Sequence, residues 1–271
     1  MSQNNNSSAQ KKSIPTSAIY LLFCISFVAL AACSDGSTGI SVASETPDAG
    51  CTIESAPKSH SVYFVLDVSG SMRLFLAELS NELQSFVESF PEYDAEGERI
   101  QLDFYVIAFV NDVKQFGGGR MTSVIALQDA FENAIAAGKD DYNLTVRSFN
   151  AEREENLLDA VGYISSLNSM SESHMVMIAT DAPFVESPGS LNEGIQVQNT
   201  YQGILQLLRV MNAGVHAFTI SDLDGLTRGY RKYEALTSLP GSSVHRLNSL
   251  TGASSKIRET LGLIARNASC Q

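Results

Sequence analysis

The 271-residue chain is acidic, with a formal net charge of −12, and 44% of its residues are hydrophobic. A chain of this length and hydrophobic content can bury one sizeable core. An acidic surface repels phosphate backbones, and no basic run appears in the sequence, so we expect no nucleic-acid partner. With 18% charged residues and no long polar repeat, the body of the chain lacks the composition of a disordered protein.

The first 32 residues have the order of a secretory signal peptide. A polar start is followed by Lys11 and Lys12, and then by an apolar run of about 15 residues, AIYLLFCISFVALAA. A membrane-spanning helix needs about 20 residues, so the run is short for a permanent span. An uncleaved N-terminal anchor is the alternative.

The sequence Leu30-Ala31-Ala32-Cys33 resembles the lipobox of bacterial lipoproteins. This resemblance implies cleavage before Cys33, which becomes the lipid-bearing first residue and attaches the protein to a membrane. Ser34 rather than Asp follows the cysteine, which favours the outer membrane over the inner membrane of a bacterial envelope. Residues 33–58 are rich in Ser, Thr, Gly, Asp and Pro without apolar periodicity, and they predict a flexible tether.

Two cysteines remain once Cys24 is assigned to the signal peptide and Cys33 to the lipid. Cysteines exported to an oxidising compartment are typically bridged, so we expect a disulfide between Cys51 and Cys270. By the chain-entropy model, a bridge around so long a loop stabilises the fold by about 5 kcal/mol, less any strain. Two unpaired thiols are the alternative.

Residues 59–271 predict one domain in which apolar strands alternate with amphipathic helices. The second strand is expected to continue into a hairpin closed by Gly117, Gly118 and Gly119, and Gly214 is expected to stop a helix. The pattern predicts an α/β fold with a doubly wound, mostly parallel sheet, helices on both faces and one short antiparallel edge strand. The expected strands cover 61–67, 101–110, 113–116, 174–181, 214–221 and 242–247, and the expected helices 75–90, 124–138, 155–167, 201–211 and 254–268.

The segment Asp67-Val68-Ser69-Gly70-Ser71-Met72 follows the first apolar strand. Its carboxylate and two hydroxyls are hard oxygen ligands, which suit Mg²⁺ or Ca²⁺ better than zinc. Asp181 ends a later apolar strand and would reach the same edge of the sheet, where ligands bind in such folds. The alternative is a turn that only caps the following helix, since Asp and Ser are favoured there.

The stretches FVLDVSGSM and MVMIATDAPF resemble the von Willebrand factor type A family over roughly residues 60–268. Members carry a metal-ion-dependent adhesion site. The resemblance implies Ser69 and Ser71 as direct ligands of Mg²⁺, Mn²⁺ or Ca²⁺, with Asp67 and Asp181 binding largely through water. It also implies a protein partner that supplies a carboxylate to the metal.

One departure from the family pattern concerns the third segment, where many members place a metal-binding Thr. Residues 150–163 contain no Thr that fits. Leu158-Asp159-Ala160 resembles the variant of integrin β subunits, which implies Glu155 as a ligand, with Glu154 as the fallback. Ordinary acids at a helix N-terminus are the alternative for both.

The charges near the motif refine this expectation. Three carboxylates around one ion should hold it more tightly while attracting an incoming carboxylate less strongly. Arg73 and Leu74 stand where integrin β subunits carry the acids of a neighbouring second metal site, so no second site is expected.

Catalysis is not expected. Phosphatases of the haloacid dehalogenase type need a second Asp where this chain has Ser69, and Ser71 does not lie in a Gly-x-Ser-x-Gly turn. The histidines are scattered without metal-binding spacing, at positions 60, 174, 216 and 245. The sequence therefore predicts a metal-dependent protein-binding or adhesion domain. The alternative is a periplasm-facing scaffold of an envelope complex in which the metal is structural.

Overall fold

The computed structural model describes residues 57–94, 96–140, 144, 154–191 and 194–269. The expected signal peptide 1–32, Cys33, Cys51 and Cys270 lie outside the described residues, as does nearly all of the expected tether. Lipidation and the disulfide therefore stay predictions. In the described part, no helix combines the length and apolar character that crossing a bilayer requires.

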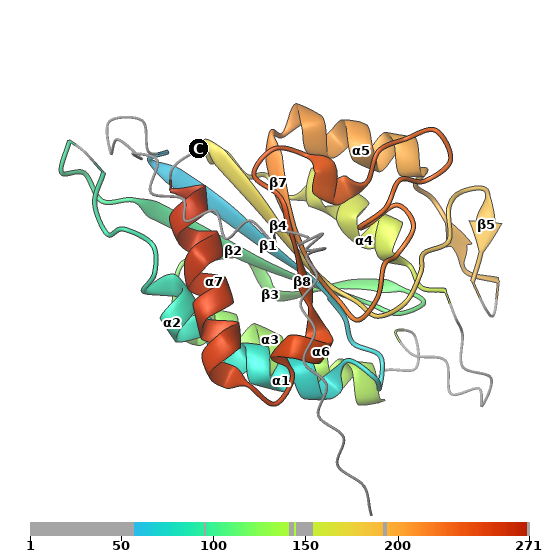
Figure 1. Ribbon diagram of the computed structural model, residues 1–271, viewed down its shortest axis with the longest axis horizontal. Coiled ribbons are helices and arrows are strands. Elements are labelled where there is room, and N and C mark those ends of the chain that lie inside the picture. The colour runs from blue at the N-terminus through green and yellow to red at the C-terminus, as the bar shows by residue number, and fades with distance from the viewer. Residues whose placement is uncertain (1–56, 95, 141–143, 145–153, 192–193, 270–271) are drawn as a thin grey trace, which may run out of the picture. The chain divides into compact units, whose positions relative to one another are not determined.

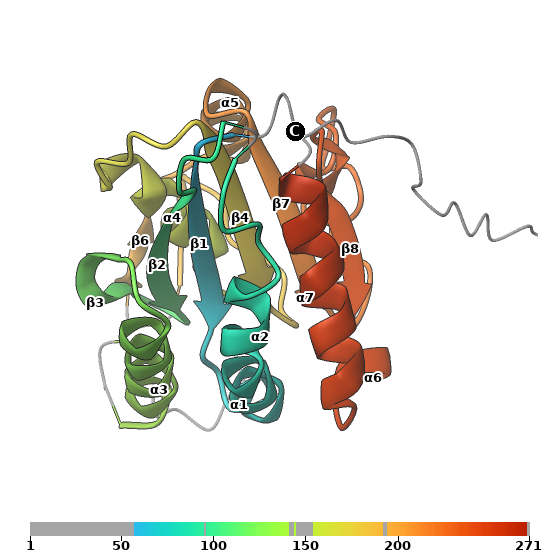
Figure 2. The same ribbon diagram turned by 90° about the vertical axis from the view of Figure 1, so that its left-hand side faces the viewer.

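A six-stranded sheet forms the centre of the described fold, in the order β3-β2-β1-β4-β7-β8, which runs from left to right in Figure 2. Five strands are parallel, and β3 pairs with β2 in the antiparallel sense. This confirms the expected mostly parallel sheet with one antiparallel edge strand. The strands are β1 (Ser59–Asp67), β2 (Gln101–Phe109), β3 (Val113–Met121), β4 (Ser173–Ala179), β7 (Ala213–Thr219) and β8 (Ser243–Arg246).

Helices cover both faces of the sheet (Figure 1). One face carries α1 (Arg73–Asn81), α2 (Leu83–Val87), α3 (Val124–Asp140), α6 (Leu247–Leu250) and α7 (Ser254–Ala268). The other carries α4 (Leu157–Tyr163), the 3₁₀ turns η2 (Ile164–Ser166) and η4 (Leu236–Ser238), and α5 (Tyr201–Val210). A strand covered on both sides favours apolar residues on both faces, which explains the unbroken apolar run Val62–Leu66 within β1.

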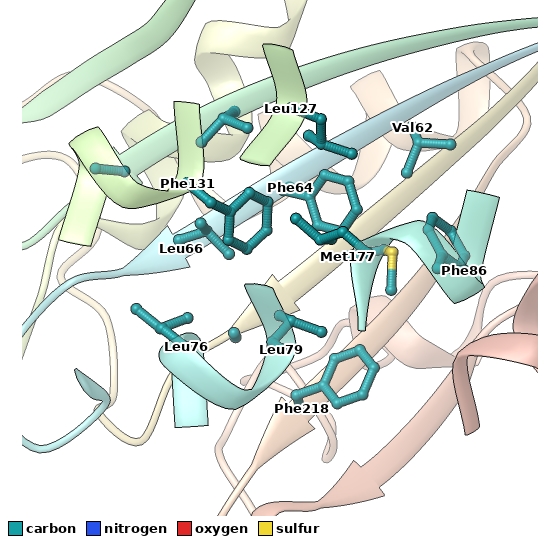
Figure 3. Packing of buried hydrophobic residues seen from close by; sticks show 14 of the residues in the cluster. Val62, Phe64, Leu66, Leu76, Leu79, Phe86, Leu127, Phe131, Met177 and Phe218 are labelled. Carbon is teal, nitrogen blue, oxygen red and sulfur yellow. The ribbon is translucent and has the colours of Figure 1, made fainter. Parts of the chain in front are cut away.

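The core on the α1–α3–α7 face is built around β1 (Figure 3). The Phe64 ring is fully buried and meets Phe131 of α3 edge-on, with ring centroids 4.9 Å apart. Phe86 of α2 packs on the same ring at 6.0 Å. These contacts fix the helices against the strand that leads directly into the Asp67 motif.

Three details differ from the expectations. The predicted helix 75–90 is broken into α1 and α2 at Glu82, whose buried carboxylate accepts a hydrogen bond from Arg258 of α7. Gly214 lies inside β7, and Asn212, with a φ of 50°, takes the left-handed conformation after α5. A small hairpin, β5 (Gly189–Ser190) with β6 (Gln196–Val197), had no clear sequence signal.

The expected hairpin closure at Gly117–Gly119 is wrong. Residues 110–112 make the turn between β2 and β3, and the three glycines lie within β3. There they form a bulge, because Phe104 pairs with Met121 while Val106 pairs with Phe116. All three have positive φ, which glycine adopts without a steric penalty.

The strand order reverses between β1 and β4. From β1 the chain first builds outward through β2 and β3, and then crosses over to add β4 on the opposite side. Open α/β sheets bind their ligands beyond the carboxyl ends of the strands at such a reversal. In this chain Asp67 ends β1, and Thr180 and Asp181 follow β4.

His60 of β1 is a polar side chain in an apolar part of the core. It is 1% exposed, it packs on the Phe90 ring, and neither of its ring nitrogens has a hydrogen-bond partner among the described residues. Burial lowers the pKa of His60 to about 4. The folded ring is therefore neutral at a pH where the unfolded ring, with a pKa of about 6.5, is protonated.

We predict that His60→Leu makes the free energy of unfolding less sensitive to acid. Stability from a His with a lowered pKa is fully present above pH 6.5 and is lost as the pH falls toward 4, because the unfolded chain takes up the proton first. Between pH 7 and pH 5 the wild type should lose about 2 kcal/mol more than the variant. Urea unfolding at the two pH values measures this, and equal losses in the two chains would contradict it.

Candidate metal site

Asp67 is a fully buried carboxylate at the carboxyl end of β1. Its Oδ1 accepts the Ser69 backbone N–H at 2.9 Å, and its Oδ2 accepts the Thr180 hydroxyl at 2.9 Å. Burial raises the pKa of Asp67, and the nearby charge of Asp181 raises it further, while hydrogen bonds from Glu155 and Ser69 lower it. The carboxylate is thus held rigidly in a place that disfavours its charge.

The two motif hydroxyls lie together at the surface beside this carboxylate. Ser69 Oγ is 3.0 Å from Ser71 Oγ, and Ser71 is exposed. Met72, 1% exposed, anchors the end of the turn in the core, and its N–H donates to Ser69 O at 3.2 Å. Met72 is also the N-cap of α1, and no side chain caps that helix. The serines therefore do not serve as helix caps, so that alternative is not realised.

Glu155 lies against Asp67, although 88 positions separate them in the chain. It is 5% exposed, and its side-chain hydrogen bond is one of the contacts that lower the pKa of Asp67. Glu154 is exposed instead. Glu155 also precedes the N-cap of α4, Asn156, so it is not an acid of the first helical turn. The structure thus brings Glu155, rather than Glu154, to the motif.

The segment that follows β4 fixes Glu155 by backbone pairing. The Glu155 N–H donates to Pro183 O at 2.8 Å, and Glu155 O accepts the Val185 N–H at 3.3 Å. Asp181 begins the same segment and is half-buried. A single loop therefore carries Asp181 and positions Glu155.

The loop itself is anchored by an aromatic cluster that gave no signal in the sequence. The Phe184 ring stacks on Tyr201 at 5.7 Å and meets Tyr230 at 5.2 Å. Gly225, with a φ of 82°, leaves room for this ring, because a Cβ there would lie 2.5 Å from Phe184. Glu186 accepts hydrogen bonds from the Tyr201 N–H and the Tyr230 hydroxyl, each at 3.1 Å.

Thr180 is the other positioning residue that sequence reasoning missed. Its hydroxyl donates to Asp67 and accepts the Ala182 N–H at 3.2 Å. The signal that could have found it is the Thr-Asp pair at the end of the apolar stretch MVMIAT. Thr180 ties the loop after β4 directly to the end of β1.

The donor set suits a hard divalent cation. Asp67, Glu155, Asp181 and the two serines offer only oxygen, as Mg²⁺, Mn²⁺ and Ca²⁺ prefer. Two acidic side chains packed together out of water are unfavourable unless something compensates their charge. Among the described residues, no three Asp, Glu, His or Cys side chains alone form a metal-binding group.

The histidines do not join this site. His216 and His245 both contact the Ser243 hydroxyl, at 2.8 and 2.6 Å, between β7 and β8. His174 lies 3.1 Å from the Tyr63 hydroxyl. They serve local packing and hydrogen bonding in the sheet.

No protein-family model matches the sequence, and a search of curated proteins finds no match. Solved structures with a similar arrangement include proximal thread matrix protein 1 from the mussel byssus, at 15% identity and a TM-score of 0.45, over 78% of this chain and 46% of that one. One structure of that mussel protein has a zinc-occupied MIDAS motif.

Two further solved structures resemble the chain at a similar level. PilB minor pilin from Streptococcus sanguinis matches at 12% identity and a TM-score of 0.45, over 80% of this chain and 62% of that one. Human COPII-coat protein Sec24c matches at 14% identity and a TM-score of 0.47, over 76% of this chain and 33% of that one. The chain therefore spans less than two thirds of each of these proteins. Similarities this distant carry no argument about function, and the fold rests on the sheet topology itself.

Proposed function

We propose that this chain binds a divalent cation, Mg²⁺ first among the candidates, at the carboxyl edge of its sheet, and binds a protein partner through it. The observation that carries the proposal is the contact between two buried acids, Asp67 and Glu155, beside a pair of surface hydroxyls. A bound cation would offset the desolvation of these acids, which come together from distant segments.

Each side chain has a distinct role in this proposal. Ser69 and Ser71 would hold the ion directly, and Asp67, Glu155 and Asp181 would surround it with negative charge. The bound ion supplies a positive centre that accepts an oxygen ligand from outside. Because Ser71 is exposed, a carboxylate of the partner can approach from that side. This chain's residues bind and orient, and none is proposed to catalyse a reaction.

The protein is proposed to act at a bacterial envelope. The lipobox-like sequence before Cys33 supports attachment through lipid, with the outer membrane favoured. The second candidate is a periplasm-facing scaffold in which the metal is structural, which the anchor permits equally.

We predict that Mg²⁺ stabilises the full-length wild type and leaves Asp67→Asn unchanged. At a concentration 100 times the dissociation constant, binding adds about 2.7 kcal/mol. For a domain of this size, that corresponds to a rise in Tm of roughly 5–10 °C. Thermal melts of both chains with Mg²⁺ and with EDTA test this. An identical response of the two chains would remove the proposed site.

Glu155→Gln and Glu154→Gln form a matched pair. We expect Glu155→Gln to weaken Mg²⁺ binding by roughly 10- to 100-fold, because a buried charge beside the ion is lost. Glu154→Gln removes the same charge from an exposed position and should leave the affinity unchanged. Isothermal titration with Mg²⁺ measures both, and the reverse ranking would assign the ligand role to Glu154.

Location separates the two candidate functions. For a surface adhesion protein, external protease should remove the domain from intact cells, whereas a periplasm-facing scaffold should resist until the outer membrane is opened. Immunoblotting of the domain before and after protease treatment gives the answer. A known periplasmic protein, which must survive the treatment, is the control.

A further inference from the structure

A hollow of about 350 Å³ lies between α1 and α3. The two helices pack side by side on one face of the sheet (Figures 1 and 2). Ala77 of α1 and Ile135 and Ala136 of α3 give it an aliphatic lining. Ala77 and Ala136 are exposed and Ile135 is half-buried, so the hollow is open to a partner's side chain.

The hollow borders the candidate metal site. Arg73, which lines it, comes two positions after Ser71 and begins α1. On the other helix, Gly138 packs so closely that a Cβ there would lie 2.2 Å from Val68 O, next to Asp67. Lys139 follows Gly138 and also lines the hollow. Both cations therefore lie at the end of the hollow nearest the Asp67 motif.

Among the described residues these two cations form no ion pair, although the chain is acidic overall. Arg73 and Lys139 are exposed, and neither forms an ion pair among the described residues, whereas Arg209, Arg228, Arg231, Arg246 and Arg258 each meet a carboxylate. Glu132 is the one acid that lines the hollow, against two cations. With a net charge of −12 for the whole chain, this is a local reversal of sign.

We propose that the hollow is a specificity site for the partner: it takes an aliphatic side chain of an acidic protein segment. The aliphatic lining excludes water behind a Leu, Ile or Met side chain, and Arg73 and Lys139 pair with the carboxylates that flank it. The inference rests on the proposed function, because the same segment offers a further carboxylate to the metal. The inference adds that the protein recognises an acidic–aliphatic pattern in the partner and not one carboxylate alone.

The test selects a random 12-residue peptide library on the full-length wild type in Mg²⁺. We expect enrichment of peptides in which Asp or Glu flanks Leu, Ile or Met. Synthetic copies should then bind at least tenfold more weakly to Arg73→Glu/Lys139→Glu. The control, Lys256→Glu/Arg266→Glu, makes the same change of charge at exposed sites on α7 and should bind as the wild type does. Ala136→Trp fills the hollow without altering charge and should also weaken binding.

The outcomes separate this inference from the metal proposal. One outcome is that peptide binding requires Mg²⁺ and Asp67 but is unchanged in Arg73→Glu/Lys139→Glu and in Ala136→Trp. This would overturn the proposed role of the hollow and leave the metal proposal intact. The opposite outcome is that acidic–aliphatic peptides bind Asp67→Asn as well as they bind the wild type, but do not bind Arg73→Glu/Lys139→Glu. This would support the proposed role of the hollow and contradict the metal proposal. No enrichment, or enrichment of basic peptides, would overturn the inference.

Discussion

The contact between Asp67 and Glu155 is the constraint around which the carboxyl edge of this fold is arranged. A buried carboxylate is costly. The nearby charge of Asp181 adds to this cost for Asp67, while hydrogen bonds from Glu155 and Ser69 offset part of it. The surroundings compensate only in part: Thr180 and the Ser69 N–H each give Asp67 one hydrogen bond. A buried carboxylate at a strand-order reversal, with hydroxyls beside it, is suited to a cation.

The packing behind the site explains how it holds its geometry. Asp67 is the last residue of β1, which Phe64 fixes against α2 and α3 on one face of the sheet. Among the described residues Glu155 lies in no strand, and backbone pairing with the loop after β4 holds it. That loop is held in turn by Phe184 and Glu186 against Tyr201 and Tyr230. Asp67 and Glu155, the proposed ligands, are thus supported by separate parts of the core.

The surface near the site has two zones, one rich in acids and one that carries two cations. Acids converge on the proposed ion, where they would tighten its binding while weakening its pull on an incoming carboxylate. Arg73 and Lys139 lie to one side, over an aliphatic hollow, and restore attraction for an acidic partner. In this proposal an acidic protein binds an acidic segment because the two cations lie beside the proposed metal site.

Sequence by itself determined the layered α/β architecture, since strands buried on both faces must be apolar throughout and helices apolar on one stripe. It also located Asp67, Ser69, Ser71 and Asp181 at strand ends, because parallel strands end at one edge. Tertiary structure alone brought Glu155, and not Glu154, against Asp67, placed the Gly117–Gly119 bulge and revealed Phe184 as an anchor. Those outcomes depend on pairing between segments far apart in the chain, and local periodicity carries no record of such contacts.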